Sequence, residues 1–241
     1  MNELTFSNSW RIVRMDGETA REQMAIDEDL AREAQPMLRL FRWSRPALSL
    51  GFKQPMPAWM DRESLASHGV EVVERPTGGG IAVHGSDLSC SVVVPQEAGV
   101  TLRALMQTVC EALASAVQSF GVECRWLNDG VASQRIDYCL TEESPYAIML
   151  GERKLCGLAL RRYPASWLVQ GSLLVRNLPA VFARVMPREV SETLQARAVS
   201  LEEATGQPIA DDELTARIME AWRTPHVGTE SPSHGVTVHA V

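Results

Sequence analysis

Lysine is almost absent from this sequence of 241 residues, in which only Lys53 and Lys154 accompany 21 arginines. Genomic base composition is a sufficient reason for the imbalance, but a guanidinium does not reproduce the compact charge of an ammonium, so the surroundings of each lysine are of interest. Basic residues do not dominate the chain either, because the formal net charge is −7. Neither nucleic acid nor an anionic membrane is therefore a predicted partner.

Long apolar runs are also absent. No stretch approaches the roughly eighteen apolar residues that a membrane-spanning helix needs, and the first ten residues lack the charged and apolar pattern of a secretory leader, so a cytoplasmic location is expected. The five cysteines show neither CxxC nor His-rich spacing. This pattern predicts neither a disulfide framework nor a metal site, and it leaves room for one reactive thiol.

The pattern of elements predicts a single α/β domain with a mixed sheet over residues 1–223 and a flexible tail over 224–241. The clearest helix follows Thr101, which can cap it, and closes at Gly121. Further helices are predicted over Glu18–Ala34, Trp59–His68, Pro179–Met186 and Asp211–Trp222. Strands are predicted over Leu38–Trp43, Ala47–Phe52, Val70–Glu74, Leu88–Val94, Tyr146–Leu150, Lys154–Arg161 and Trp167–Val175.

Three consecutive glycines, Gly78 to Gly80, lie between Arg75 and His84 in strand-like surroundings. The run matches neither GxxxxGK[ST] nor GxGxxG, so it is not a familiar phosphate-binding loop. Glycine is required where φ is positive or where another group packs against the backbone. The run is therefore either a tight bend between two strands or a seam across which a ligand lies.

Cys139 lies in a polar stretch that is typical of a loop, whereas Cys90 and Cys110 fall in strand and helix patterns. A cysteine in a buried element usually behaves as a small apolar residue. A loop cysteine is the better candidate nucleophile if a cation lies beside it. Cys139 is therefore the candidate reactive thiol.

Four cations, Arg153, Lys154, Arg161 and Arg162, surround one predicted hairpin. Strand alternation predicts that Lys154 and Arg161 point to opposite faces. The cluster is either a solvated basic turn or a functional group in which Lys154 reaches into a pocket beside Gly157. In the second case, the cations could steer an acidic partner.

Four ordered segments together resemble one known family: Arg75-Pro76-Thr77-Gly78-Gly79-Gly80 with His84, Gly151 to Ala159, Val169 to Leu174, and Ser200 to Gly206. They resemble signatures of the biotin/lipoate protein ligase superfamily, in particular its lipoate-ligase and octanoyl/lipoyl-transferase branch. The similarity runs from about Trp10 to Trp222. It implies a twisted mixed sheet flanked by helices, a tunnel for a medium-chain acyl group and an acceptor lysine on a lipoyl-carrier domain.

The resemblance also implies roles for individual residues. Cys139 and Lys154 would be catalytic, with Lys154 polarising the acyl carbonyl. The acyl-binding residues would be Arg75, Thr77, Gly78, Gly79, Gly80, His84, Gly157, Ala159, Gln170 and Gly171, with the acyl chain running over the bare glycines.

Two activation routes exist within the branch. A transferase takes the acyl group from an acyl carrier protein, in one subgroup through a cysteine thioester, and needs no cofactor, whereas a ligase uses free lipoate or octanoate with ATP and Mg. Cys139 stands seven residues before Tyr146, as in the cysteine-using transferases. This spacing favours the transferase, with a carrier domain like the glycine cleavage H protein or a dehydrogenase E2 as acceptor.

Other positions favour the alternatives. Gly80 completes a ligase-like triple glycine, and Gly85, Leu158 and Val169 each replace a common family residue. Ser144-Pro145, in contrast, stands where many ligases carry Asn-Asp before the hairpin, which favours the transferase, while Asn128-Asp129 upstream leaves the ligase role open. The alternatives are an ATP-dependent lipoate–protein ligase and an inactive paralogue that only binds acylated carriers.

Overall fold

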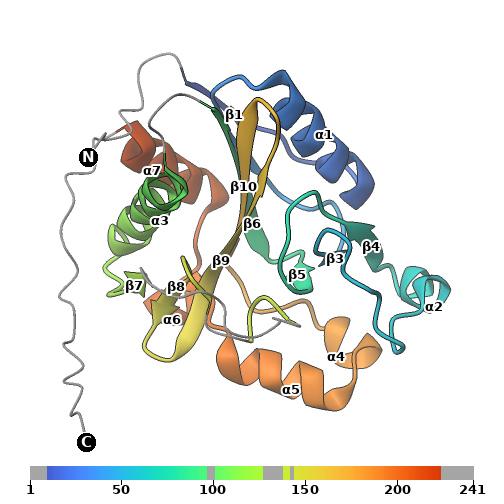
Figure 1. The fold of residues 1–241 in the computed structure, drawn as a ribbon. Helices are drawn as coiled ribbons and strands as arrows, with labels where there is room; N and C mark the ends of the chain where they lie inside the picture. Colours follow the sequence, from blue (N-terminus) through green and yellow to red (C-terminus); the bar gives the residue numbers. More distant parts are fainter. Residues whose placement is uncertain (1–9, 97–100, 127–137, 142–143, 224–241) are drawn as a thin grey trace, which may run out of the picture.

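A seven-stranded mixed sheet forms the centre of the protein, and a three-stranded sheet lies beside it (Figure 1). The computed structural model describes residues 10–96, 101–126, 138–141 and 144–223. Across the large sheet the strands are β1 (Arg11–Arg14), β2 (Met37–Phe41), β6 (Asp87–Pro95), β10 (Ser166–Leu174), β9 (Arg153–Arg162), β8 (Ile148–Leu150) and β7 (Arg125–Trp126). Across the small sheet they are β4 (Glu71–Glu74), β3 (Ala47–Leu50) and β5 (Ala82–His84). The predicted mixed sheet is confirmed. The small sheet, which brings together strands from both sides of the glycine run, was not predicted.

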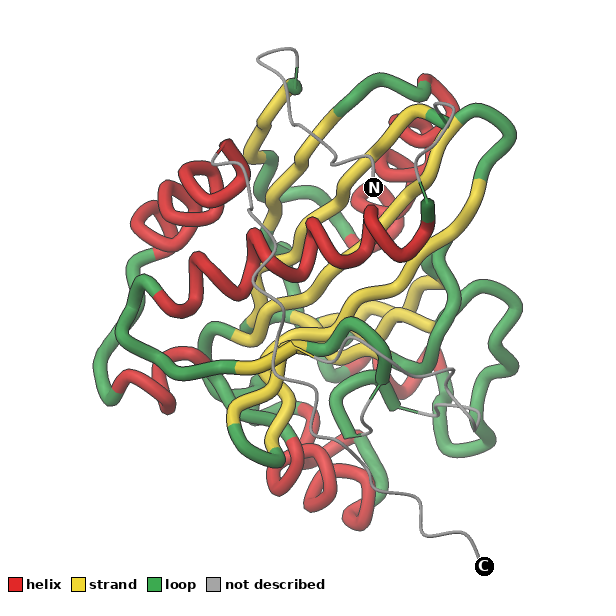
Figure 2. The backbone as a smooth tube through the Cα atoms, turned by 60° about the vertical axis from the view of Figure 1, so that its left-hand side comes forward, coloured by secondary structure: helices red, strands yellow, loops and turns green. Residues whose placement is uncertain are grey.

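Helices cover both faces of the large sheet, as predicted (Figures 1 and 2). Helices α3 (Leu102–Gln118) and α7 (Asp211–Arg223) pack on one face, and α1 (Ala20–Glu33) packs on the other. Side chains of β6 point alternately to the two faces. Cys90 and Val92 join the core under α3 and α7, whereas Val93 packs with Ala31 of α1. The face under α1 is therefore separate from the main apolar core.

Capping residues set the ends of the helices. Thr101 accepts a hydrogen bond from the Ala104 N–H at 3.1 Å, as predicted for α3. Thr19 caps α1 with Glu22 in a capping box, so the helix begins after the predicted Glu18. Asp61 accepts from the Ser64 N–H and caps α2 (Arg62–Ser67), which is therefore shorter than the predicted Trp59–His68.

Three short helices follow β10: α4 (Phe182–Val185), α5 (Arg188–Arg197) and α6 (Leu201–Thr205). The helix predicted over Pro179–Met186 is confined to α4. Helices α5 and α6 were not predicted, because each buries one apolar residue, Leu194 in α5 and Leu201 in α6. An element with so little buried surface leaves no apolar period in the sequence.

A one-residue bulge in β9 changes the face to which Lys154 points. Met149 of β8 pairs with Lys154, but its neighbour Ile148 pairs with Cys156, so Leu155 is an extra residue in the ladder. Ile148 and Met149 are neighbours in β8 and face opposite sides of the sheet, so their partners Cys156 and Lys154 also face opposite sides. Arg161 is five residues beyond Cys156 in the same strand, so alternation places it on the same side as Lys154. The prediction that Lys154 and Arg161 point to opposite faces is therefore wrong.

Some predictions concern residues that the structure does not describe. The predicted tail over 224–241 and the Asn128-Asp129 pair lie outside the described residues. Among the residues that are described, no helix is long and apolar enough to cross a membrane.

Candidate active site

A cavity lies on the α1 face of the large sheet, where β9 and β10 meet the small sheet. Its empty space, counted together with the open solvent at its mouth, is about 390 Å³. Met24, Phe41 and Trp43 supply apolar walls. The cavity is lined by Cys139, which was predicted to be catalytic, and by the predicted binding residues Arg75, His84, Gly157, Ala159, Gln170 and Gly171.

Gly157 leaves open the space in which the Cys139 sulfur and the Lys154 side chain meet. A Cβ at residue 157 would lie 2.8 Å from Cys139 Sγ, 3.3 Å from Lys154 Cε and 3.6 Å from Lys154 Nζ. All three atoms lie within 4 Å of one point, so the sulfur and the ammonium are neighbours. The structure thus brings together the two residues that were predicted to be catalytic.

Backbone pairing holds Cys139 in place. Its N–H donates to the Ile81 carbonyl at 2.8 Å, and Ile81 forms a parallel bridge with Tyr138. The Tyr138 hydroxyl accepts a hydrogen bond from Trp59 Nε1 at 3.0 Å. The cysteine is therefore fixed to the chain segment that directly follows the glycine run.

Lys154 is 1% exposed, and its ammonium binds the segment that carries the cysteine. Nζ donates to the Cys139 carbonyl at 2.6 Å and to Ser144 Oγ at 2.8 Å. Burying an ammonium is costly unless it is paired or hydrogen-bonded. These bonds satisfy the ammonium and hold its charge beside the sulfur.

Arg75 holds the glycine run from within. Nη1 donates to the Ser49 carbonyl at 2.9 Å, and Nη2 donates to the carbonyls of Gly78 and Gly80, each at 2.7 Å. Burial lowers the pKa of Arg75, while negative charge at Cys139 acts to raise it. The guanidinium is thus a second cation that interacts with Cys139.

The glycine run does not form the floor of the cavity. Gly78, Gly79 and Gly80 are not among the residues that line it, and neither is Thr77. The group that approaches this backbone is instead Gly51, whose missing side chain leaves room for the Gly79 carbonyl. Gly79 itself has a φ of +91°. The run is therefore a tight bend packed against another backbone segment, one of the two readings that the sequence left open.

His84 belongs to a buried polar chain along the cavity wall. Its Nδ1 lies 2.9 Å from Asp87 Oδ2, its Nε2 lies 2.8 Å from Ser49 Oγ, and its ring stacks on Trp43 at 4.0 Å. A charged carboxylate only accepts, so Nδ1–H donates to Asp87, and Ser49 Oγ, which accepts from Arg75 Nη1 at 3.1 Å, is the partner of Nε2.

Asp87 is the anchor of this chain. Burial acts to raise the pKa of its carboxyl, but His84 and the hydroxyls of Ser89 and Ser172 together hold that pKa well below its ordinary range. The Ser89 and Ser172 hydroxyls donate to Oδ2 at 2.7 and 2.8 Å. The carboxylate therefore remains charged inside the protein and fixes the His84 ring.

Gln170 connects the cavity to a second buried network. Its Nε2 donates to Asp27 Oδ2 at 2.6 Å, and its Oε1 accepts from the Thr77 hydroxyl at 2.6 Å. Asp27 in turn accepts from Arg39 Nη1 at 2.6 Å, and both partners are 0% exposed. Thr77 thus acts on the cavity through Gln170 and does not line it.

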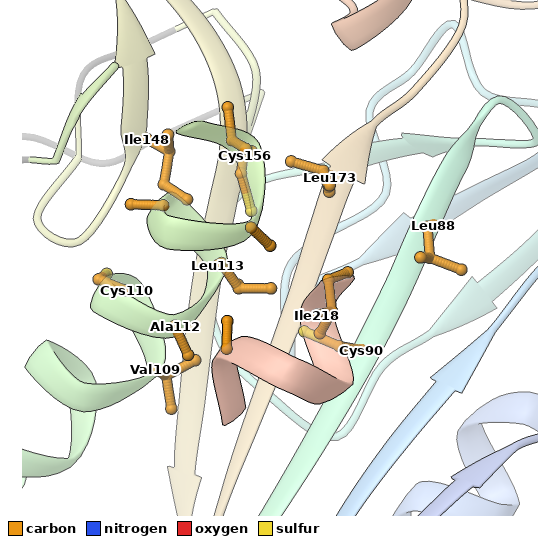
Figure 3. Close-up of a cluster of buried hydrophobic side chains, with 14 of the residues drawn as sticks. Leu88, Cys90, Val109, Cys110, Ala112, Leu113, Ile148, Cys156, Leu173 and Ile218 are labelled. Carbon is orange, nitrogen blue, oxygen red and sulfur yellow. The ribbon is translucent and has the colours of Figure 1, made fainter. Parts of the chain in front are cut away.

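The other four cysteines are not set up to act as nucleophiles. Burial raises the pKa of Cys90 to about 12 and that of Cys124 to about 11, and it also raises the pKa values of Cys110 and Cys156. Figure 3 shows Cys90, Cys110 and Cys156 among core side chains. A thiolate is the reactive species, so these thiols are inert.

The four hairpin cations do not form one patch. Arg153 pairs with Glu203 and donates to the Ala198 carbonyl, while Lys154 is buried. Arg162 stacks over Trp167, and as the neighbour of Arg161 in β9 it faces the opposite side. The predicted steering cluster is therefore wrong as a unit, and of its four cations only Arg161 lies on the cavity face without being buried.

Sequence reasoning missed Ser49, Ser144, Asp27 and Asp87. The family pattern offered one signal for Asp87, because an aspartate often follows the signature histidine. This chain has Gly85 at that place, and Asp87, three positions after His84, contacts the His84 ring instead. The other three carry no local motif, because their partners are distant in sequence. Within the described part of the chain, no group of three or more His, Cys, Asp or Glu side chains could hold a metal ion.

A mixed sheet flanked by helices, with a cysteine and a buried lysine beside a partly apolar cavity, defines an α/β domain with a candidate active site. The chain belongs to the family of lipoyl protein ligase A/B catalytic domains, whose family model matches residues 19–223. The predicted resemblance is therefore confirmed.

Curated relatives carry one name. Octanoyltransferase LipM of Symbiobacterium thermophilum is 29% identical over 222 residues, which are 84% of this chain and 81% of the relative. Octanoyltransferase LipM of Kyrpidia tusciae is 28% identical over 236 residues, which are 89% of this chain and 86% of the relative.

Solved structures show the same fold. A bipartite lipoate protein ligase from Thermoplasma acidophilum matches with a TM-score of 0.71 at 19% identity, over 89% of this chain and 82% of that chain. Lipoate-protein ligase A bound with ATP matches with a TM-score of 0.70 at 21% identity, over 88% of this chain and 83% of that chain.

Proposed function

We propose that this protein transfers an octanoyl group to a lysine of a lipoyl-carrier domain through a thioester on Cys139. The observation that carries this proposal is the meeting of Cys139 Sγ and the Lys154 side chain in the space beside Gly157. The octanoyltransferase relatives support the same chemistry. We further propose that residues 1–223 form the catalytic domain.

The reaction would proceed in two transfers. The Cys139 thiolate attacks the carbonyl of an octanoyl thioester, and the donor leaves as a thiolate that takes up a proton. The neutral amine of the acceptor lysine then attacks the Cys139 thioester. An amide forms, the amine loses its proton, and the Cys139 thiolate leaves.

The residues around Cys139 suit both transfers. Lys154 and Arg75 place positive charge beside Cys139, and a cation beside the carbonyl stabilises the negative oxygen of each tetrahedral intermediate. The cavity walls formed by Met24, Phe41 and Trp43 would bury the acyl chain. Burying six methylenes contributes about 5 kcal/mol to binding.

Octanoyl-acyl carrier protein is the proposed donor, and a carrier domain like the glycine cleavage H protein or a dehydrogenase E2 is the proposed acceptor. An existing thioester supplies the driving force for amide formation, so the proposed reaction needs no ATP. The ATP-dependent ligase and the inactive carrier-binding paralogue remain the alternatives that the experiment must exclude.

Intact-mass spectrometry after mixing with octanoyl-acyl carrier protein tests the proposal. We expect one octanoyl adduct on the wild type and on Cys124→Ser, a control at the other partly exposed cysteine, and none on Cys139→Ala. Addition of an apo lipoyl domain without ATP should remove the adduct and octanoylate the domain. An adduct that persists in Cys139→Ala, or transfer that requires ATP and free acid, would exclude the thioester route.

A further inference from the structure

Two of the three exposed large apolar side chains in the described part of the chain lie in one loop. Phe52 is 39% exposed and Met56 is 45% exposed, both in the loop that follows β3. The third, Leu102, is 40% exposed and begins α3, which covers the opposite face of the large sheet. Exposed apolar side chains that gather in one place often mark an interaction site.

The loop is fixed to the candidate active site at both ends. At its start, the Phe52 N–H donates to the Thr77 carbonyl at 2.8 Å, beside the contact of Gly51 with Gly79. At its end, Trp59 binds the hydroxyl of Tyr138, the residue before Cys139. The loop that carries the exposed side chains is therefore anchored to the segment of the glycine run at one end and to the neighbour of Cys139 at the other.

Two cations lie on the same surface. The Arg161 guanidinium stacks over the Phe52 ring at 3.9 Å, and its Nη1 donates to the Pro76 carbonyl at 3.1 Å. Lys53, one of only two lysines in the chain, places Nζ 5.2 Å from the same ring. Its φ of +57° is a left-handed conformation that costs about 1–2 kcal/mol in a non-glycine residue. The surface thus combines apolar side chains with positive charge in a protein whose net charge is −7.

We propose that Phe52, Lys53, Met56 and Arg161, here called the Phe52 surface, dock the acceptor domain. The partner that fits is a protein domain with acidic side chains and an apolar patch next to its acceptor lysine. This inference rests on the proposed function, because it assigns the partner of the second transfer.

The length of the lysine side chain argues for the acceptor over the donor. An acceptor lysine must bring its own backbone to the rim of the cavity, because only four methylenes separate its amine from that backbone. A carrier whose thioester is on a long prosthetic arm can stay further away. Charge complementarity would direct an acidic acceptor to this surface despite the like net charge of the enzyme.

Separate measurement of the two transfers tests the assignment. Octanoyl-enzyme is first formed and isolated, and then its octanoyl group is transferred either to an apo lipoyl domain or to hydroxylamine. In Arg161→Glu and in Phe52→Ser/Met56→Ser, we expect the rate constant for the lipoyl domain to fall at least about tenfold at low salt. Acylation by the donor and release by hydroxylamine should stay within about twofold of the wild type, since the Phe52 surface does not line the cavity.

Matched controls are present in the same chain. Arg162→Glu makes the same charge change one residue away on the opposite face of β9, and Leu102→Ser removes an equally exposed apolar side chain from a remote helix. Both should transfer to the lipoyl domain at the wild-type rate. Lys53→Glu alters an exposed side chain, so it keeps the test valid if the other variants fold poorly.

The outcomes separate the two proposals. If the wild type forms no octanoyl-enzyme, the proposed function fails, and direct binding of the apo lipoyl domain to wild type and Arg161→Glu still decides the docking surface. Octanoyl-enzyme formation with domain transfer that is equal in Arg161→Glu and Arg162→Glu would overturn the docking proposal alone. A loss confined to acylation by the carrier donor would also overturn it, because the surface would then belong to the donor.

Discussion

The carbonyl of Gly79 occupies the space that a side chain at Gly51 would need. Any Cβ at residue 51 would overlap that oxygen and approach the Gly78 and Gly79 carbonyl carbons at 3.1 and 3.0 Å. The loop after β3 and the glycine run are therefore packed backbone against backbone. This contact fixes both the Arg75 clamp and the exposed loop that begins at Gly51.

Gly51→Ala should disturb this contact and Gly78→Ala should not. A methyl group at residue 51 forces the two backbone segments apart, which we expect to cost about 1–3 kcal/mol of unfolding free energy. A Cβ at Gly78 meets nothing within 4 Å, so that variant is a control inside the same glycine run. Urea unfolding measures the difference, and equal stability of the two variants would contradict the packing argument.

Gly157→Ala should slow the acylation of Cys139 more than Gly171→Ala does, and it should lower the unfolding free energy less. The new methyl group lies 2.8 Å from Cys139 Sγ, so it displaces the sulfur from Lys154. Gly171→Ala is the contrasting variant, because its methyl group meets Cys90 Sγ and Leu158 Cδ2, each at 2.7 Å. It should lower the unfolding free energy by about 1–3 kcal/mol. Burst-phase acylation and urea unfolding, measured on both variants, should rank them in opposite order.

Local patterns predicted the parts of the fold that bury one continuous face. Helix α3 was predictable because its apolar residues repeat with the helical period and Thr101 caps it. Lys154 was predicted to be catalytic from the resemblance, but its direction was predicted wrongly. The direction depends on the bulge at Leu155, which arises from pairing with β8 and leaves no mark in the sequence of β9.

Long-range partners account for the missed parts of the site. Asp27 and Gln170 are 143 positions apart, yet they share a hydrogen bond at 2.6 Å. A single sequence shows that a carboxylate is present but not what it binds. For the glycine run, the resemblance implies contact with the acyl chain, which stays a prediction, and the structure adds the packing of Gly51 against the backbone of Gly79.

Asp27→Asn should strongly destabilise the protein. Asp27 and Arg39 are both 0% exposed, so the variant leaves the Arg39 charge buried without its counter-ion, at a cost of about 3–5 kcal/mol. Asp27→Leu/Arg39→Met, which replaces the pair by apolar side chains, should be markedly less destabilised. Urea unfolding of both variants tests this, and a double variant at least as unstable as Asp27→Asn would contradict the account.

Asp87→Asn should lower stability in a pH-dependent way. The pKa of Asp87 in the folded protein is well below its ordinary range, so folding favours the charged carboxylate. Its contribution is complete above the unfolded pKa of about 3.9 and is lost as the pH falls through the lower folded pKa. We therefore expect Asp87→Asn to cost about 1.5–3 kcal/mol at neutral pH.

The difference between wild type and Asp87→Asn should stay constant from about pH 8 to pH 5 and then shrink below about pH 4, since the wild type alone loses the contribution of the carboxylate there. Asp29→Asn is the control, because the Asp29 side chain is 70% exposed and its pair with Arg32 lies on the surface. It should change stability by less than about 1 kcal/mol throughout. Urea unfolding across this pH range measures both differences. A difference for Asp87→Asn that stays constant down to about pH 2 would show that the pKa of Asp87 is not depressed, and the ordered His84 ring would then need another cause.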